Sequence, residues 1–342
     1  MIQMKQFSKK TSVFRALSVI LTVSAIISRV LARAFAYDTE IGYFRQDTLL
    51  PILSYLFLGL IAVLAIASLF AYRKIEIPDT VVDGMRHVCI AERVASVLAF
   101  LIILSANCTL IFAYWIKGSA VLLPSAFTAF GAIVGFFAAF YFLLCAIPTR
   151  RGKIFHTVCG FAVILFGLYI VGVCYFDLYT PMNNPVKMLC QITTIASLLF
   201  MLTDLRFALD SIRTARFLFT STLTLGFSAV AIFTGPFFSV LNGDYNILYQ
   251  AFHAVNLAIF LYAVVRTSRF VALMTQEEEE IPENDDDGEK IDDGNSDEIS
   301  DERKSPSENE NFEEKPSEKD EADKGDDIST EDKAPTEDES NI

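Results

Sequence analysis

The feature that most constrains this chain is a series of eight long apolar stretches within its first 276 residues. An α-helix needs about 20 predominantly apolar residues to cross the hydrocarbon core of a bilayer, and each stretch meets that requirement. Transmembrane barrels show shorter segments of alternating polarity instead. The sequence therefore predicts an all-α, polytopic membrane helix bundle, with spans at about 12–35, 49–72, 94–116, 121–147, 154–176, 186–205, 216–241 and 247–270.

Composition changes abruptly after residue 276. Residues 277–342 hold 30 of the 41 acidic residues and 7 of the 28 basic ones, a net charge of −23, whereas residues 1–276 carry +10. The only aromatic residue of the acidic segment is Phe312, so the segment cannot bury enough apolar surface to offset its ordering entropy. We therefore predict a transmembrane domain over 1–276 and a disordered acidic tail over 277–342. The tail is either a solvated, self-repelling segment or a docking segment for a basic partner.

The distribution of Lys and Arg predicts the orientation of the bundle. With the N-terminus in the cytoplasm, sixteen of these residues flank the cytoplasmic side and five the outer side, which follows the positive-inside rule. An even number of spans places both termini in the cytoplasm. We expect a multi-pass protein of the plasma membrane.

Two features near the outer face leave alternatives open. The first apolar run is short and is followed by Arg29 and Arg33. It is either a span whose Arg side chains reach the outer interface, near Asp38, or a cleaved signal peptide. Cys174 and Cys190 lie at the outer ends of the fifth and sixth spans. They are either free thiols or a disulfide, since the spacing does not fix their separation.

Polar residues in the outer half of the spans form the candidate binding site. Tyr249, His253 and Asn256 follow the i, i+4, i+7 spacing of one helix face, and amides facing lipid would be costly, so these side chains should point inward. The set either joins helices by hydrogen bonds or forms an outward-facing pocket for a small-molecule ligand. The predicted set is Tyr249, His253, Asn256, Gln191, Thr194 and Asn107.

Two further motifs concern the shape and packing of single spans. Gly235-Pro236 lies in the outer quarter of the seventh span, where the proline should kink or end the helix and is a candidate hinge. Gly131 and Gly135 are spaced four residues apart in the fourth span. Small residues at this spacing let helices approach closely, either within one bundle or in a dimer.

The sequence contains few groups suited to catalysis. Its three His residues fall outside the common metal and hydrolase motifs, and its six Cys residues contain no Cys-x-x-Cys. We therefore expect no catalytic, cofactor or metal site. Composition excludes a soluble enzyme, a secreted disulfide scaffold and a nucleic-acid-binding domain. The leading interpretation is a non-enzymatic sensor or accessory membrane module. The alternatives are a transporter of a small neutral or amphipathic solute and, less favoured, an intramembrane enzyme.

Overall fold

A computed structural model describes residues 2–280 with short gaps at 39–40, 46, 117–124, 148–152, 178–179, 182, 208, 210 and 242–246. The prediction of a disordered acidic tail falls almost entirely on residues 281–342, which lie outside the described ranges.

The first two spans form a helical hairpin at one side of the bundle. Helix α1 (Ile2–Phe35) leads into two short antiparallel strands, β1 (Tyr37–Asp38) and β2 (Tyr43–Phe44), and then into α2 (Leu50–Ala71). Between the strands, Gly42 has a φ of 76°, a conformation that favours glycine over residues with a Cβ. The sequence analysis did not predict this small hairpin.

The next part of the chain begins with a short helix, α3 (Asp79–Arg86), whose buried residues are Val81 and Met85. These two residues lie one turn apart, so α3 buries one face against the bundle. Helix α4 (Ile90–Ile111) ends in a π-helical turn, η1 (Phe112–Ile116), and is followed by α5 (Ser125–Ala146) and α6 (Lys153–Phe176).

The last three spans are α7 (Pro185–Leu205), α8 (Thr214–Leu241) and α9 (Ile247–Glu280). Asn184 caps α7, since its Oδ1 accepts hydrogen bonds from the backbone N–H groups of Val186 and Lys187. Its Nδ2 donates to the carbonyl of Gly42 at 2.8 Å. The cap of α7 therefore also fixes the strand hairpin that follows α1.

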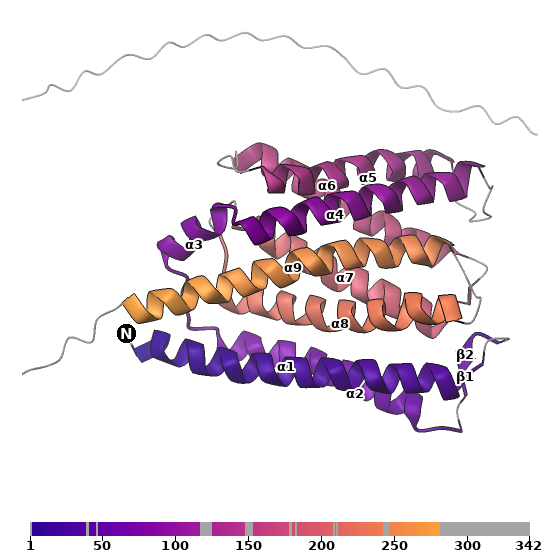
Figure 1. The fold of residues 1–342 in the computed structure, drawn as a ribbon, viewed down its shortest axis with the longest axis horizontal. Helices are drawn as coiled ribbons and strands as arrows, with labels where there is room; N and C mark the ends of the chain where they lie inside the picture. Colours follow the sequence, from indigo (N-terminus) through magenta and orange to yellow (C-terminus); the bar gives the residue numbers. More distant parts are fainter. Residues whose placement is uncertain are drawn as a thin grey trace, which may run out of the picture. The chain divides into compact units, whose positions relative to one another are not determined.

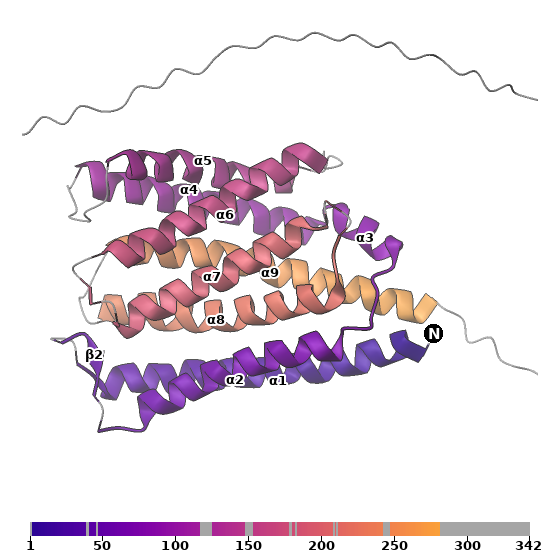
Figure 2. The ribbon, with the colours of Figure 1, turned by 180° about the vertical axis from the view of Figure 1, so that it is seen from behind.

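Figures 1 and 2 show the spans lying side by side, with the α1–α2 hairpin on one side and α4, α5 and α6 on the other. Helices α7, α8 and α9 lie between these groups: α8 contacts α1 and α2, while α9 contacts α4 and α7 packs on α6. The start of α1 and the end of α9 lie at the same end of the bundle, as an even number of spans requires.

Eight helices within the described residues are long and apolar enough to cross a membrane, which confirms the predicted fold class. Large apolar side chains cover their outer faces: Phe70 is 74% exposed, Val158 62% and Val19 63%. In water such a surface would be unfavourable, whereas lipid solvates it well. The chain is therefore a multi-pass integral membrane protein in contact with the lipid bilayer.

The first span differs from its predicted arrangement in one respect. Arg29 and Arg33 lie near the outer end of α1 but are buried there, with 2% and 7% of their surface exposed. Arg29 donates to the carbonyl of Pro185 at 2.9 Å, and Arg33 donates to the carbonyl of Thr234 at 3.3 Å. Carbonyls at the outer ends of α7 and α8 thus each accept a hydrogen bond from a guanidinium group that would be costly in lipid. These bonds tie α1 into the bundle.

Candidate functional site

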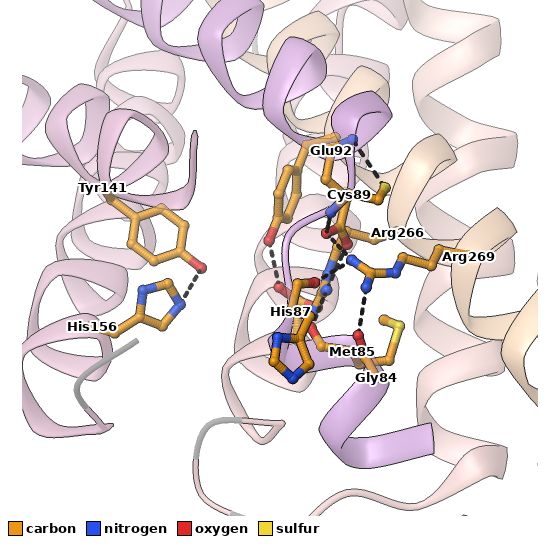
Figure 3. Close-up of polar contacts among 11 residues, drawn as sticks. Gly84, Met85, His87, Cys89, Glu92, Tyr141, His156, Arg266 and Arg269 are labelled. Carbon is orange, nitrogen blue, oxygen red and sulfur yellow. Dashed lines mark hydrogen bonds and ion pairs between the residues drawn. The ribbon is translucent and has the colours of Figure 1, made fainter. Parts of the chain in front are cut away.

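The most densely connected polar site lies at the end of the bundle where α4 begins and α7 ends. At its centre is Arg266 on α9, which is 1% exposed (Figure 3). Its Nε donates to Asp204 Oδ1 at 2.9 Å, and its Nη1 donates to Glu92 Oε1 at 2.7 Å. Tyr262, one turn earlier on α9, donates its hydroxyl to Asp204 Oδ2 at 2.9 Å. One guanidinium thus connects three spans.

The same site holds the short helix α3 against the bundle. Arg266 Nη1 also donates to the carbonyl of Met85 at 2.8 Å. Arg269 pairs with Glu92 and donates to the carbonyls of Gly84 and His87 (Figure 3). The carbonyls at the C-terminal end of α3 lack intrahelical donors and carry partial negative charge, so the two Arg side chains stabilise that end.

Glu92 is both an ion-pair partner and a helix cap. Its carboxylate accepts a hydrogen bond from the backbone N–H of Cys89, and Cys89 Sγ accepts one from the N–H of Glu92. This reciprocal arrangement is a capping box at the start of α4. The Glu92 carboxylate therefore accepts hydrogen bonds from a backbone N–H group and from Arg side chains. Glu92 is 0% exposed, and a buried charge needs such partners.

We define the ion-pair site as Glu92, Asp204, Tyr262, Arg266 and Arg269. Its two carboxylates and two guanidinium groups balance in charge, and the buried members are fully hydrogen-bonded to one another. A buried charge in this setting is tolerable only when paired. The site therefore fixes the relative positions of α3, α4, α7 and α9 at the end of the bundle from which the acidic segment continues.

The predicted outer polar set is divided among several places. Asn256, which is 0% exposed, donates to Thr194 Oγ1 at 3.1 Å and accepts from Ser197 Oγ at 3.2 Å. Ser197 Oγ lies 3.5 Å from Ser228 Oγ. This group joins α7, α8 and α9 by hydrogen bonds, the geometry expected of polar contacts between membrane helices.

The Asn256 group leads to a prediction about stability. Changing Asn256 to Ala and Thr194 to Val, singly and together, should reveal a coupling energy of about 0.6 kcal/mol, the average for such hydrogen bonds in membranes. Reversible unfolding of the purified protein in mixed detergent micelles measures all four free energies. The matched pair Thr109→Val and Asn256→Ala should show no coupling, because Thr109 bonds to the carbonyl of Ser105 within its own helix. Coupling near zero for the first pair would contradict the assignment.

Tyr249 has a different partner from the rest of the set. Its hydroxyl donates to Asp177 Oδ2 at 3.0 Å, while Lys187 Nζ donates to the carbonyl of Asp177 at 2.8 Å. Cys174 and Cys190 lie beside this group with their Sγ atoms 4.0 Å apart, and both are free thiols. The Cys174 thiol donates a hydrogen bond to Cys190 Sγ, and the two cysteines are not joined by a disulfide.

His253 and the Gly235-Pro236 pair lie together at the contact of α8 and α9. His253 is 4% exposed, and neither ring nitrogen has a hydrogen-bond partner among the described residues. A Cβ at Gly235 would lie 2.4 Å from His253 Nε2, so only glycine allows the imidazole to approach. Helix α8 continues through Pro236 to Leu241 and does not end there. The hinge remains a prediction.

Asn107 belongs to the contact of α4 with α5. Its Nδ2 donates to the carbonyl of Ala132 at 3.0 Å, and its Oδ1 would be 2.3 Å from a Cβ at Gly135. A Cβ at Gly131 would be 2.3 Å from the ring of Tyr169 on α6. Because these two positions lack a Cβ, neighbouring helices of the same bundle can pack closely against α5. The sixth member of the predicted set, Gln191, is half-buried.

The third histidine forms a separate pair. His156 on α6 places its Nε2 3.4 Å from the hydroxyl of Tyr141 on α5, and the two rings are 4.9 Å apart (Figure 3). In the described part of the chain, no group of three or more His, Cys, Asp or Glu residues is placed to hold a metal ion.

The sequence analysis did not identify the ion-pair site, and it did not name Asp177 as the partner of Tyr249. A usable signal was present: charged residues close to a hydrocarbon boundary usually imply a partner of opposite charge. Comparison with protein families, with curated proteins and with solved structures finds no match to this chain.

Proposed function

We propose that this membrane protein is a non-enzymatic module, a sensor or accessory subunit, in which α9 links the state of the bundle to an acidic cytoplasmic tail. The observation that carries the proposal is the ion-pair site. Arg266 binds carboxylates from α4 and α7 and a carbonyl from α3, and α9 then continues for about four turns to Glu280. Any rearrangement of α4 or α7 must therefore change the hydrogen bonds that hold Arg266, and with it α9, in place.

The charge of this end of the bundle supports a cytoplasmic position. Lys9 and Lys10 on α1, Arg73 after α2, and Arg213 before α8 lie at the end where α1 begins and α9 ends. Cytoplasmic loops carry an excess of Lys and Arg. Both termini then lie in the cytoplasm, and the plasma membrane is the expected location.

The net charge of −23 in residues 277–342 supports a partner of opposite charge. An acidic segment attracts a basic protein surface over a distance set by salt screening. A basic cytoplasmic partner would bind this tail, which follows α9 in the sequence. The bundle needs no catalytic group for this role.

The geometry gives less support to a transporter. In the outer half, the side chains of Asn256 and Tyr249 are occupied by hydrogen bonds to other elements of the bundle. In the inner half, Thr224 donates to the carbonyl of Ala196 and Thr220 donates to carbonyls of its own helix. An intramembrane enzyme would need its nucleophile and base to meet, whereas His253 and His156 lie against different helices.

The proposal is tested by photo-crosslinking from the tail in native membranes. A photoreactive amino acid at position 312 of the full chain should give one dominant adduct with a basic protein, identified by mass spectrometry. A matched chain with the acidic residues of 277–342 changed to their amides should lose that adduct while the bundle still accumulates. Absence of any adduct, together with solute uptake by proteoliposomes of the purified protein, would favour the transporter and overturn the proposal.

A further inference from the structure

A cavity of about 340 Å³ lies between α1, the end of α2, α8 and α9. This volume is within the range of about 300–1,000 Å³ that is typical of ligand sites. Its walls are mainly apolar, and several hydroxyl groups line it. Arg15 is the only charged residue among its lining residues in the described part of the chain. The cavity is separate from both the ion-pair site and the outer polar set.

Two hydroxyls in the wall lack partners. Ser221 on α8 is 1% exposed and Thr267 on α9 is 9% exposed, and neither side-chain oxygen has a hydrogen-bond partner among the described residues. Other hydroxyls of α8 donate to a carbonyl one turn earlier, as Thr222 does to Leu218 at 2.8 Å and Thr234 does to Val230 at 2.6 Å. An unsatisfied donor within a membrane is costly. Ser221 and Thr267 therefore indicate an oxygen-bearing ligand in the cavity.

The polar groups of the cavity lie at one depth. Arg15, Ser221 and Thr267 are each 20 residues from the outer end of their helix, at Phe35, Leu241 and Ile247. At about 1.5 Å per residue, this places all three about 30 Å from the outer ends. That distance is close to the thickness of the hydrocarbon core. The three side chains therefore lie toward the end of the bundle where α1 begins and α9 ends, which the distribution of Lys and Arg assigns to the inner leaflet.

The mouth of the cavity opens toward lipid. Val19 and Val23 line it and are 63% and 48% exposed, on the outward face of α1. Deeper in the wall, Leu225 and Phe260 provide an apolar surface for a hydrocarbon chain. A ligand that enters sideways from the bilayer meets apolar walls first and a cation at the membrane surface. Arg15 forms no ion pair with the residues that the structure describes.

We propose that this cavity binds an anionic membrane glycerolipid of the inner leaflet. One acyl chain lies between α1, α8 and α9, the ester oxygens accept hydrogen bonds from Ser221 and Thr267, and the phosphate pairs with Arg15. Arg guanidinium groups bind phosphate with charge-assisted hydrogen bonds, often in pairs. The proposal does not depend on the role of the acidic tail, because none of its residues belongs to residues 277–342.

The test is lipid retention by the full chain in nanodiscs of phosphatidylcholine with a minor fraction of phosphatidylglycerol. Native mass spectrometry should find one phosphatidylglycerol bound per chain. Arg15→Gln should weaken this retention about tenfold, the factor expected from loss of one charge-assisted contact. Lys10→Gln removes the same charge from an exposed side chain of the same helix and should leave retention unchanged. Equal effects of the two variants would show surface attraction only and overturn the site.

A second pair of variants tests the cavity itself. Ala229→Phe fills the wall on α8 and should abolish retention, while Ala62→Phe, in a separate groove of about 240 Å³, should not. Ser221→Ala with Thr267→Ala removes the two donors without adding volume and should weaken retention severalfold while the protein stays folded. Equal retention of phosphatidylcholine and phosphatidylglycerol, or displacement of the lipid by glycerol phosphate alone, would contradict the proposal.

Discussion

Replacing Arg266 by Met is expected to lower the unfolding free energy by about 3–5 kcal/mol, because the change leaves buried carboxylates without their main counter-charge. Asp204 and Glu92 are 3% and 0% exposed, and Arg266 donates to both. Arg269 still pairs with Glu92, so the larger part of the loss falls on Asp204. The measurement is reversible unfolding of the purified protein in detergent micelles.

Arg213→Met is the matched control, since Arg213 is an exposed residue at the same end of the bundle and should change stability by at most about 0.5 kcal/mol. Arg266→Lys separates charge from geometry. It keeps the positive charge but loses the planar donor fork that reaches both carboxylates and the Met85 carbonyl. We expect an intermediate loss. A loss below about 1 kcal/mol for Arg266→Met would show that water reaches the site and that the ion pairs are not essential to the bundle.

The fold could be predicted from sequence because it depends on a property of single segments. A stretch such as 49–72 is apolar over enough residues to cross a membrane, whatever its neighbours are, and the structure places α2 there. The ends were less predictable. Helix α9 continues ten residues beyond the predicted boundary at 270, through four apolar residues and then the polar residues 275–280. Hydropathy marks the hydrocarbon boundary, not the end of the helix.

The sites were less predictable because they depend on the rotation and pairing of helices. Spacing correctly indicated that Asn256 and Tyr249 point into the bundle, yet their partners, Ser197 and Asp177, come from different helices. Asn107 is also an amide within a span, like Asn256, but its side chain bonds to α5. Periodicity identifies which residues share a face, and it does not identify the helix that the face meets. Arg266 and Glu92 are 174 positions apart, and their pairing likewise depends on which helices meet in the bundle.

Replacing Gly135 by Ala is expected to lower the unfolding free energy by about 2–3 kcal/mol, although alanine is the better helix former. The added Cβ would lie 2.3 Å from Asn107 Oδ1 and 2.8 Å from Phe166 Cε2. Both neighbours are buried, and Asn107 is held in place by its bond to the carbonyl of Ala132. The methyl group therefore forces α4, α5 or α6 to shift, or breaks that bond. Detergent unfolding curves give the difference directly.

Gly59→Ala provides the matched control for this change. Gly59 lies within another span, and a Cβ there would meet nothing within 4 Å, so the substitution should raise stability by up to about 1 kcal/mol through helix propensity. The two substitutions should change the unfolding free energy in opposite directions, which distinguishes the effect of close packing from that of helix propensity. Adding Asn107→Ala to Gly135→Ala removes the obstructing amide and should recover part of the loss, because Phe166 still obstructs the methyl group. If Gly135→Ala instead stabilises the protein as Gly59→Ala does, α4 and α5 are not packed as closely as the structure shows, and the four-residue glycine spacing serves another contact.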